Sequence, residues 1–241
     1  MLELRGITKT FGGVKAVQDV DMSVAPGEVR GLIGPNGAGK STLVNLISGL
    51  LTHSAGAMTL DGVPLDDLSS QQRALKGIAR TFQNLRVFSS LTAQQNIDVA
   101  GYTGTASARG GDDLLQEAIV RFDLADKLND PANSLAYGQL RRLEIVRALA
   151  LRPRVLMLDE PAAGMNEQET EALGAALGWV RDKSECSILV IDHDLKFIMA
   201  LSERITVLNM GKVIAEGTPQ AVSENRQVID AYLGEDQEHA A

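Results

Sequence analysis

A glycine-rich stretch between an apolar run and a helical pattern constrains this chain more than any other feature. Residues 29–33 are mostly apolar, Gly34-Pro35-Asn36-Gly37-Ala38-Gly39-Lys40-Ser41 follow them, and residues 42–47 have helical character. Glycines let a backbone wrap closely around a triphosphate, because a Cβ atom would obstruct the approach. The order of strand, loop and helix therefore predicts a phosphate-binding loop. A glycine-rich turn without a ligand is the alternative.

Each part of this loop matches a charge on a bound nucleoside triphosphate. The helix that begins near Lys40 offers unpaired N–H donors and the positive end of its dipole. The Lys40 ammonium is suited to the β- and γ-phosphates, and the Ser41 hydroxyl to Mg²⁺. The stretch predicts a triphosphate and Mg²⁺ as ligands.

Composition excludes several other classes of protein. The chain has 241 residues, enough for one large α/β domain or two small ones. Its 23 basic and 31 acidic residues give a net charge of −8, which argues against a nucleic-acid partner. The single cysteine, Cys186, favours a reducing compartment. Because the sequence has no signal pattern and no apolar run long enough to span a bilayer, we expect a cytosolic chain whose membrane role would depend on a partner subunit.

Three apolar runs have the pattern of parallel strands that are covered on both faces, at residues 29–33, 155–158 and 188–191. Polar residues follow each run: the glycine-rich loop, Asp159-Glu160 and Asp192-His193. Ligands of an open parallel sheet bind beyond the carboxyl ends of its strands. The sequence therefore predicts an α/β fold with its site at that edge.

The rest of the chain divides into antiparallel and helical parts. Alternating residues at 2–8 and 17–24 predict an antiparallel pair beside the main sheet, and the pattern over 91–151 predicts an inserted helical subdomain. Residues 101–111 are predicted to form a mobile surface loop. Further elements are expected as hairpins at 57–63 and 204–215, a strand at 77–82, and helices at 69–75, 194–201 and up to about residue 233.

The polar residues after the strands have the chemistry that nucleotide hydrolysis requires. We assign Asp159 to Mg²⁺, directly or through water, and Glu160 to the water that attacks the γ-phosphate. A carboxylate that caps the next helix is the alternative. His193 suits the γ-phosphate and Gln83 suits Mg²⁺ or the attacking water, although a packed histidine and a surface glutamine are common.

Two further places could contact a nucleotide. Residues 135–139 contain a glycine at the start of a helical pattern, which is either an anion-binding helix terminus or an ordinary helix entry. Phe11 could stack on adenine, but aromatic residues near a first sheet are more often core residues.

In their order and spacing, these motifs resemble the nucleotide-binding domain of ABC transporters over nearly the full length. The resemblance implies a P-loop NTPase core with a mainly parallel sheet, an antiparallel β subdomain and an inserted helical subdomain. It divides the chain into a core at 1–84 and 153–233, a helical subdomain at 85–152, and a frayed tail at 234–241.

The same resemblance implies a role for each motif. Phe11 would be the adenine-stacking aromatic residue and His193 the switch histidine. The remaining roles are a Walker A loop from Gly34 to Thr42, a Q-loop at Gln83, a signature loop with Ala136, Tyr137, Gly138 and Gln139, and a Walker B strand ending at Asp159 and Glu160.

The resemblance also implies partners. Two ATPase subunits, identical or related, would form a head-to-tail dimer in which one signature loop covers the γ-phosphate held by the other Walker A loop. ATP would close the dimer, and residues 84–88 would pass the motion to membrane-spanning permease subunits. A solute-binding protein would act indirectly, and the chain would be peripheral, on the cytoplasmic face of the inner or plasma membrane.

Some residues narrow the resemblance further. Ala136 and Asn166 replace the usual serine and aspartate, whereas Tyr137-Gly138-Gln139, residues 80–84 and residues 141–145 resemble ATPases of branched-chain amino acid importers. The sequence is more similar to their LivG type than to their LivF type. A urea or amide importer and a lipid or lipopolysaccharide exporter are alternatives. A soluble ABC protein is another, although the chain lacks the tandem domains or long coiled coil that such proteins typically carry.

Overall fold

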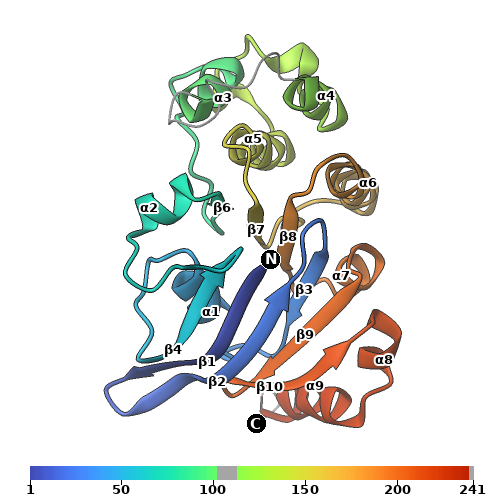
Figure 1. Cartoon of the computed structure of the whole chain (residues 1–241). Helices are drawn as coiled ribbons and strands as arrows, with labels where there is room; N and C mark the ends of the chain where they lie inside the picture. Colours follow the sequence, from blue (N-terminus) through green and yellow to red (C-terminus); the bar gives the residue numbers. More distant parts are fainter. Residues whose placement is uncertain (102–112, 239–241) are drawn as a thin grey trace.

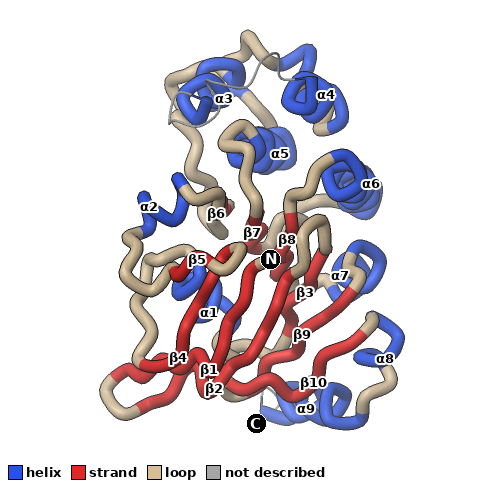
Figure 2. The backbone as a smooth tube through the Cα atoms, in the orientation of Figure 1, coloured by secondary structure: helices blue, strands red, loops and turns tan. Residues whose placement is uncertain are grey.

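The computed structural model describes residues 1–101 and 113–238. Two sheets, each with helices against it, make up the lower part of the view in Figure 1, and further helices lie above them. Figure 2 shows how the strands of both sheets run close together in the lower part of the molecule. Beyond Gly101, the predicted surface loop at 101–111 lies outside the described residues.

The larger sheet has six strands in the order β10-β9-β3-β8-β7-β6. Strands β9, β3, β8, β7 and β6 are mutually parallel, and only β10 is antiparallel to its neighbour β9. Every residue of the three central strands is buried, as their mostly apolar runs predict. The mainly parallel sheet is therefore confirmed. Its strands are β3 (Val29–Ile33), β6 (Ile78–Arg80), β7 (Val155–Asp159), β8 (Ser187–Ile191), β9 (Arg204–Asn209) and β10 (Lys212–Gly217).

The smaller sheet is antiparallel, with the order β2-β1-β4-β5. Its strands are β1 (Leu2–Phe11), β2 (Val14–Val24), β4 (Ala55–Leu60) and β5 (Val63–Pro64). The predicted antiparallel pair is confirmed, but both strands are longer than predicted. Pairing continues to Phe11 and Val14 at the tip of the hairpin, where exposed side chains give no alternating signal.

Helix α1 (Lys40–Ile47) lies between the two sheets and forms one half of the core with them. Its buried Leu46 belongs to an apolar cluster with β1, β2, β4 and one face of the parallel sheet. The opposite face of the parallel sheet packs on α5 (Tyr137–Leu149), α6 (Glu167–Lys183) and α7 (Leu195–Leu201). The sheet is thus covered on both faces, and its ligands have access at the edges.

An inserted group of helices separates β6 from β7 in the chain and lies at the top of Figure 1. It consists of α3 (Ala93–Gly101), α4 (Asp113–Arg121) and α5, with 3₁₀ turns at Ala125–Lys127 and Ala132–Ser134. The inserted helical subdomain is therefore confirmed, whereas its boundaries at residues 85 and 152 stay a prediction. None of the helices within the described residues is long and apolar enough to cross a membrane.

The ends of β6 and of the last helix also differ from the predicted ones. Strand β6 ends at Arg80 rather than at residue 82, because the Phe82 N–H turns from the sheet to the Glu144 carboxylate of α5. The last helix, α9 (Arg226–Glu238), continues past residue 233, so the described part of the predicted frayed tail is helical. Glu and Gln in this segment are good helix formers. The remaining short helices are α2 (Ser70–Leu75) and α8 (Pro219–Ser223).

Two leucines near α1 allow a test of the core. Leu46 is fully buried between the sheets, whereas Leu50 beyond the helix is 48% exposed. We expect Leu46→Ala to lower the free energy of unfolding by about 2 to 5 kcal/mol, because it leaves a cavity. Leu50→Ala should change it by about 0.5 kcal/mol or less. Urea denaturation followed by circular dichroism measures both, and equal losses would contradict the packing described.

Candidate active site

The glycine-rich loop connects β3 to α1 and is held closely by two neighbouring strands. Gly34 has φ 147°, and an added Cβ would lie 2.0 Å from the Leu208 carbonyl oxygen of β9. Gly39 has φ 104°, and its Cβ would lie 2.5 Å from the Ala16 carbonyl oxygen of β2. Side chains are excluded at both positions by backbone conformation and by space. Between them lie Pro35, Asn36, Gly37 and Ala38.

The start of α1 is arranged to receive an anion. Gly39 occupies the N-cap position, and no side chain caps the helix there. Lys40 folds back over the loop, where its Nζ donates to the carbonyl oxygens of Gly34 at 2.6 Å and Pro35 at 2.8 Å. Ser41 and Thr42 complete the first turn. An uncapped helix terminus next to an ammonium group is suited to phosphate.

The end of β7 turns sharply between the two predicted carboxylates. Asp159 still pairs with Ile191 of β8 and is only 7% exposed. Glu160 adopts the left-handed conformation at φ 50°, and its N–H donates to the Ile191 carbonyl oxygen at 2.7 Å. Such a conformation is uncommon for a residue with a side chain and is often found at functional sites. The turn carries Glu160 out of the strand while Asp159 stays within it.

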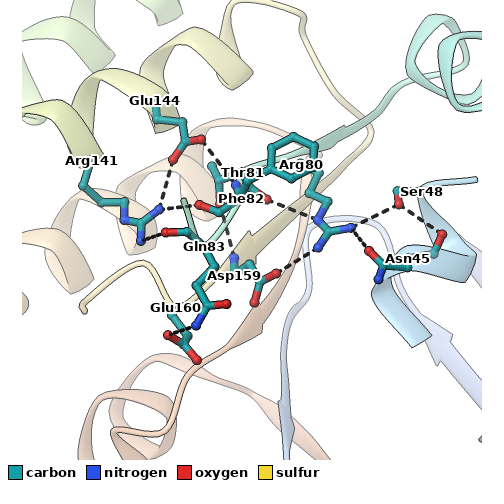
Figure 3. A network of polar contacts seen from close by, with 10 residues as sticks. All are labelled: Asn45, Ser48, Arg80, Thr81, Phe82, Gln83, Arg141, Glu144, Asp159 and Glu160. Carbon is teal, nitrogen blue, oxygen red and sulfur yellow. Dashed lines mark hydrogen bonds and ion pairs between the residues drawn. The ribbon is translucent and has the colours of Figure 1, made fainter. Parts of the chain in front are cut away.

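Two other predicted residues lie near this turn. Gln83 Nε2 donates to Glu160 Oε2 at 3.2 Å, so the two side chains point toward each other (Figure 3). His193 follows β8, its side chain is 74% exposed, and its Nδ1 lies 3.5 Å from Asp192 Oδ1. The buried Asp192 carboxylate also accepts the N–H of Ala162, in the loop after β7. The carboxyl ends of β7 and β8 thus share one polar network.

Oxygen ligands for Mg²⁺ are present, although no cage of side chains exists. Within the described residues, no three His, Cys, Asp or Glu side chains gather closely enough to hold a metal ion. Mg²⁺ in nucleotide sites usually takes one or two protein ligands, with phosphates and water completing its shell. The Ser41 hydroxyl, the Gln83 amide and the buried Asp159 carboxylate are of the required kind.

The predicted signature residues form a second group at the start of α5. The Ala136 N–H donates to Gln139 Oε1 at 3.0 Å, but alanine has no side-chain oxygen, so no side chain at the N-cap accepts an N–H of the first turn of α5. A Cβ on Gly138 would lie 3.3 Å from Glu169 Oε1, so Gly138 lies close to the Glu169 side chain of α6. The Tyr137 ring is 47% exposed and lies against Gly164, in the loop after β7.

Phe11 and Asn166 each have a defined place. Phe11 ends β1 with 46% of its surface exposed, so it is not the core residue that the alternative interpretation proposes. The Lys9 ammonium lies 5.0 Å from its ring centroid. Asn166 caps α6 by accepting the Glu169 N–H at 2.9 Å, which an aspartate could also do. An exposed aromatic ring is available to stack on a base.

A buried ion pair that the sequence does not single out holds the backbone at Gln83 in place. Arg141 Nη1 lies 3.1 Å from Glu144 Oε2 in α5, and the guanidinium donates to the carbonyl oxygens of Phe82 at 2.6 Å and Gln83 at 3.1 Å. Glu144 accepts the N–H groups of Phe82 and Arg86, both at 3.3 Å (Figure 3). The only sequence signal was a pair of charges three residues apart, which is also typical of a solvated helix face.

Comparison with known protein families identifies the family of this chain. Residues 17–163 match the model of the family described as ABC transporter. The chain belongs to the ABC transporter family. Residues 212–238 also match a family described as branched-chain amino acid ATP-binding cassette transporter.

Named relatives cover nearly the whole chain. The chain is 41% identical to the high-affinity branched-chain amino acid transport ATP-binding protein BraF of Pseudomonas aeruginosa, over 98% of both chains. It is 40% identical to LivG of Escherichia coli over the same shares. It is also 33% identical, over 98% of each chain, to LptB of Escherichia coli, a lipopolysaccharide export system ATP-binding protein.

Solved structures agree with the fold. A nucleotide-free ATP-binding cassette from an ABC transporter superposes with a TM-score of 0.84 and 26% identity, over 96% of this chain and 98% of the other. A dimeric ATP-binding cassette bound to ADP and Pi superposes with a TM-score of 0.80 and 26% identity, over 91% of this chain and 99% of the other. The predicted P-loop NTPase fold and the predicted ATPase activity are thereby confirmed. The roles of single residues stay predictions.

Lys40 offers a direct test of nucleotide binding. Wild-type protein should gain about 2.7 kcal/mol of stability at a hundredfold excess of ATP over its Kd. We expect Lys40→Ala to lose most of this gain, because the phosphates lose their countercharge. A thermal-shift titration with Mg-ATP measures the difference, and the exposed Lys76→Ala serves as the matched control. A full ATP-dependent shift in Lys40→Ala would remove Lys40 from the site.

Proposed function

We propose that this chain is an ATPase subunit of an importer for branched-chain or other hydrophobic amino acids. The observation that carries this proposal is the match of residues 212–238 to the branched-chain amino acid cassette family. Full-length similarity is also higher to BraF, at 41%, than to LptB, at 33%, which disfavours a lipopolysaccharide exporter. A urea or amide importer remains the competing solute class.

The geometry supports a separate role for each of the residues proposed to surround ATP. Gly34 to Thr42 would bind the phosphates, with Lys40 on the β- and γ-phosphates and Phe11 on the adenine. Glu160 would accept the proton of the attacking water, in a position set by its contact with Gln83. The exposed His193 would donate to the γ-phosphate.

Mg²⁺ would be held by Ser41, Gln83 and Asp159. When bound, the ion neutralises charge on the β- and γ-phosphates. Asp159 is suited to this role because it stays buried and fixed within β7, whereas Glu160 has turned away toward Gln83.

A second ATPase subunit, identical or LivF-like, would complete each site. The signature residues Ala136 to Gln139 pack on the loop after β7 through Tyr137 and Gly164. They form a group separate from the phosphate loop, and a partner's loop would therefore meet them across a head-to-tail dimer. The dimeric cassette bound to ADP and Pi is the structural precedent for this arrangement.

Residues 84–88 would carry the motion to permease subunits. Phe88 is 50% exposed, and the Arg147 guanidinium carbon lies 5.5 Å from its ring centroid. Arg141 and Glu144 of α5 hold the backbone of Gln83 and Arg86, so a shift at Gln83 would be transmitted to this surface. The chain would lie on the cytoplasmic face of the inner or plasma membrane, and a solute-binding protein would act from outside through the permease.

Glu160→Gln tests the catalytic assignment. The amide can no longer accept a proton, so we expect turnover to fall by a factor of about 10² to 10⁴ while ATP still binds. The variant should accumulate a closed dimer with ATP, visible on size-exclusion chromatography. Glu185→Gln, an exposed residue before β8, should behave as wild type. Unchanged turnover in Glu160→Gln would contradict the assignment.

Reconstitution identifies the solute. The chain should co-purify from membranes with permease subunits and a second ATPase, and the complex should be assayed in proteoliposomes with its solute-binding protein. We expect leucine to stimulate ATP hydrolysis several-fold and urea to have no effect. Stimulation by urea or by a lipid alone would overturn the proposed solute while leaving the ATPase assignment intact.

A further inference from the structure

Arg80 is a nearly buried cation to which the proposed reaction gives no role. It is the last residue of β6, and its side chain is 9% exposed. The guanidinium reaches the neighbouring strand β7, where Nη2 donates to Asp159 Oδ2 at 2.9 Å (Figure 3). Nη1 donates to Asn45 Oδ1 at 2.5 Å and to Ser48 Oγ at 3.3 Å, at the far end of α1.

The guanidinium is fixed in this position. Its Nε donates to the Thr81 carbonyl oxygen at 3.2 Å, so each of its three nitrogens has a partner. The Phe82 ring centroid lies 4.9 Å from its central carbon. A planar guanidinium with several hydrogen bonds keeps its orientation better than a lysine ammonium would. Arg80 therefore links the helix after the phosphate loop to the strand that ends at Asp159.

This contact changes the charge that Asp159 can offer to a metal ion. A buried carboxylate requires a partner, and Arg80 supplies one. A divalent cation at Asp159 would meet a carboxylate whose charge is already shared, and it would be repelled by the guanidinium nearby. Arg80 thus orients the carboxylate and at the same time opposes metal binding.

We propose that Arg80 is a positioning residue that shares the Asp159 carboxylate with Mg²⁺ and thereby weakens the affinity of the nucleotide site for the metal. The inference rests on the proposed role of Asp159 as a Mg²⁺ ligand. The direction of the expected change in metal affinity distinguishes this role from a purely structural one. Removing a residue that only supported the fold would disorder Asp159 and weaken metal binding. Removing a competing cation tightens it.

Mn²⁺ binding to the full chain with saturating ADP tests the inference, with free Mn²⁺ measured by electron paramagnetic resonance. Arg80→Gln should bind Mn²⁺ about tenfold more tightly than wild type, because one nearby positive charge is removed. Arg80→Lys retains the charge and should stay within about threefold of wild type. Asn45→Ala leaves both charges of the pair in place and is the matched control. Thermal melts verify folding, and Arg80→Met replaces Arg80→Gln if that variant does not fold.

Asp159→Asn distinguishes a failure of the proposed metal role of Asp159 from a failure of the inference about Arg80. It should weaken Mn²⁺ binding, and in the double variant Arg80→Gln should tighten it less than in the wild-type background, because only the direct repulsion by the guanidinium is then removed. If Asp159→Asn weakens binding but folded Arg80→Gln or Arg80→Met binds Mn²⁺ no more tightly than wild type, the inference about Arg80 is wrong. If Asp159→Asn leaves Mn²⁺ binding unchanged, the proposed metal role of Asp159 fails, and the inference fails with it.

Discussion

The parallel pairing of β3, β8 and β7 is the constraint on which the site depends. Each strand is fully buried, so the polar residues that follow it can lie only where the strand ends. Parallel direction brings these ends to one edge of the sheet. The phosphate loop, Asp159-Glu160 and Asp192-His193 are distant in sequence and are brought to this edge by backbone hydrogen bonds.

Buried charges connect this edge to the rest of the molecule. Arg80 joins Asp159 to the end of α1, and Arg141 with Glu144 joins the backbone around Gln83 to α5. Isolated buried charges are costly, so a pair with several hydrogen bonds strongly disfavours any arrangement that separates its partners. Specific polar contacts therefore join the end of α1 to the carboxylate strand, and the backbone around Gln83 to the helix with the signature residues.

The same contacts bear on the proposed coupling between ATPase subunits and a permease. The helix α5 begins with the signature residues and also binds the backbone of Gln83 and Arg86. In the proposed mechanism, a displacement of Gln83 relative to Glu160 would therefore affect α5 and the exposed Phe88. The single helix α5 connects the group proposed to face a partner subunit with the surface proposed for the permease.

Local sequence determined the glycine-rich loop, the central strands and the places of the polar residues that follow them, because glycine placement and buried apolar runs act over a few neighbouring residues. It did not determine the roles of Arg80, Arg141 and Glu144, since a charged residue on a strand end or helix looks the same whether it faces water or a buried partner. The tertiary structure decided which charges pair, where β6 ends and that Phe11 is exposed. These outcomes depend on contacts between residues far apart in the chain, and only the folded molecule brings them together.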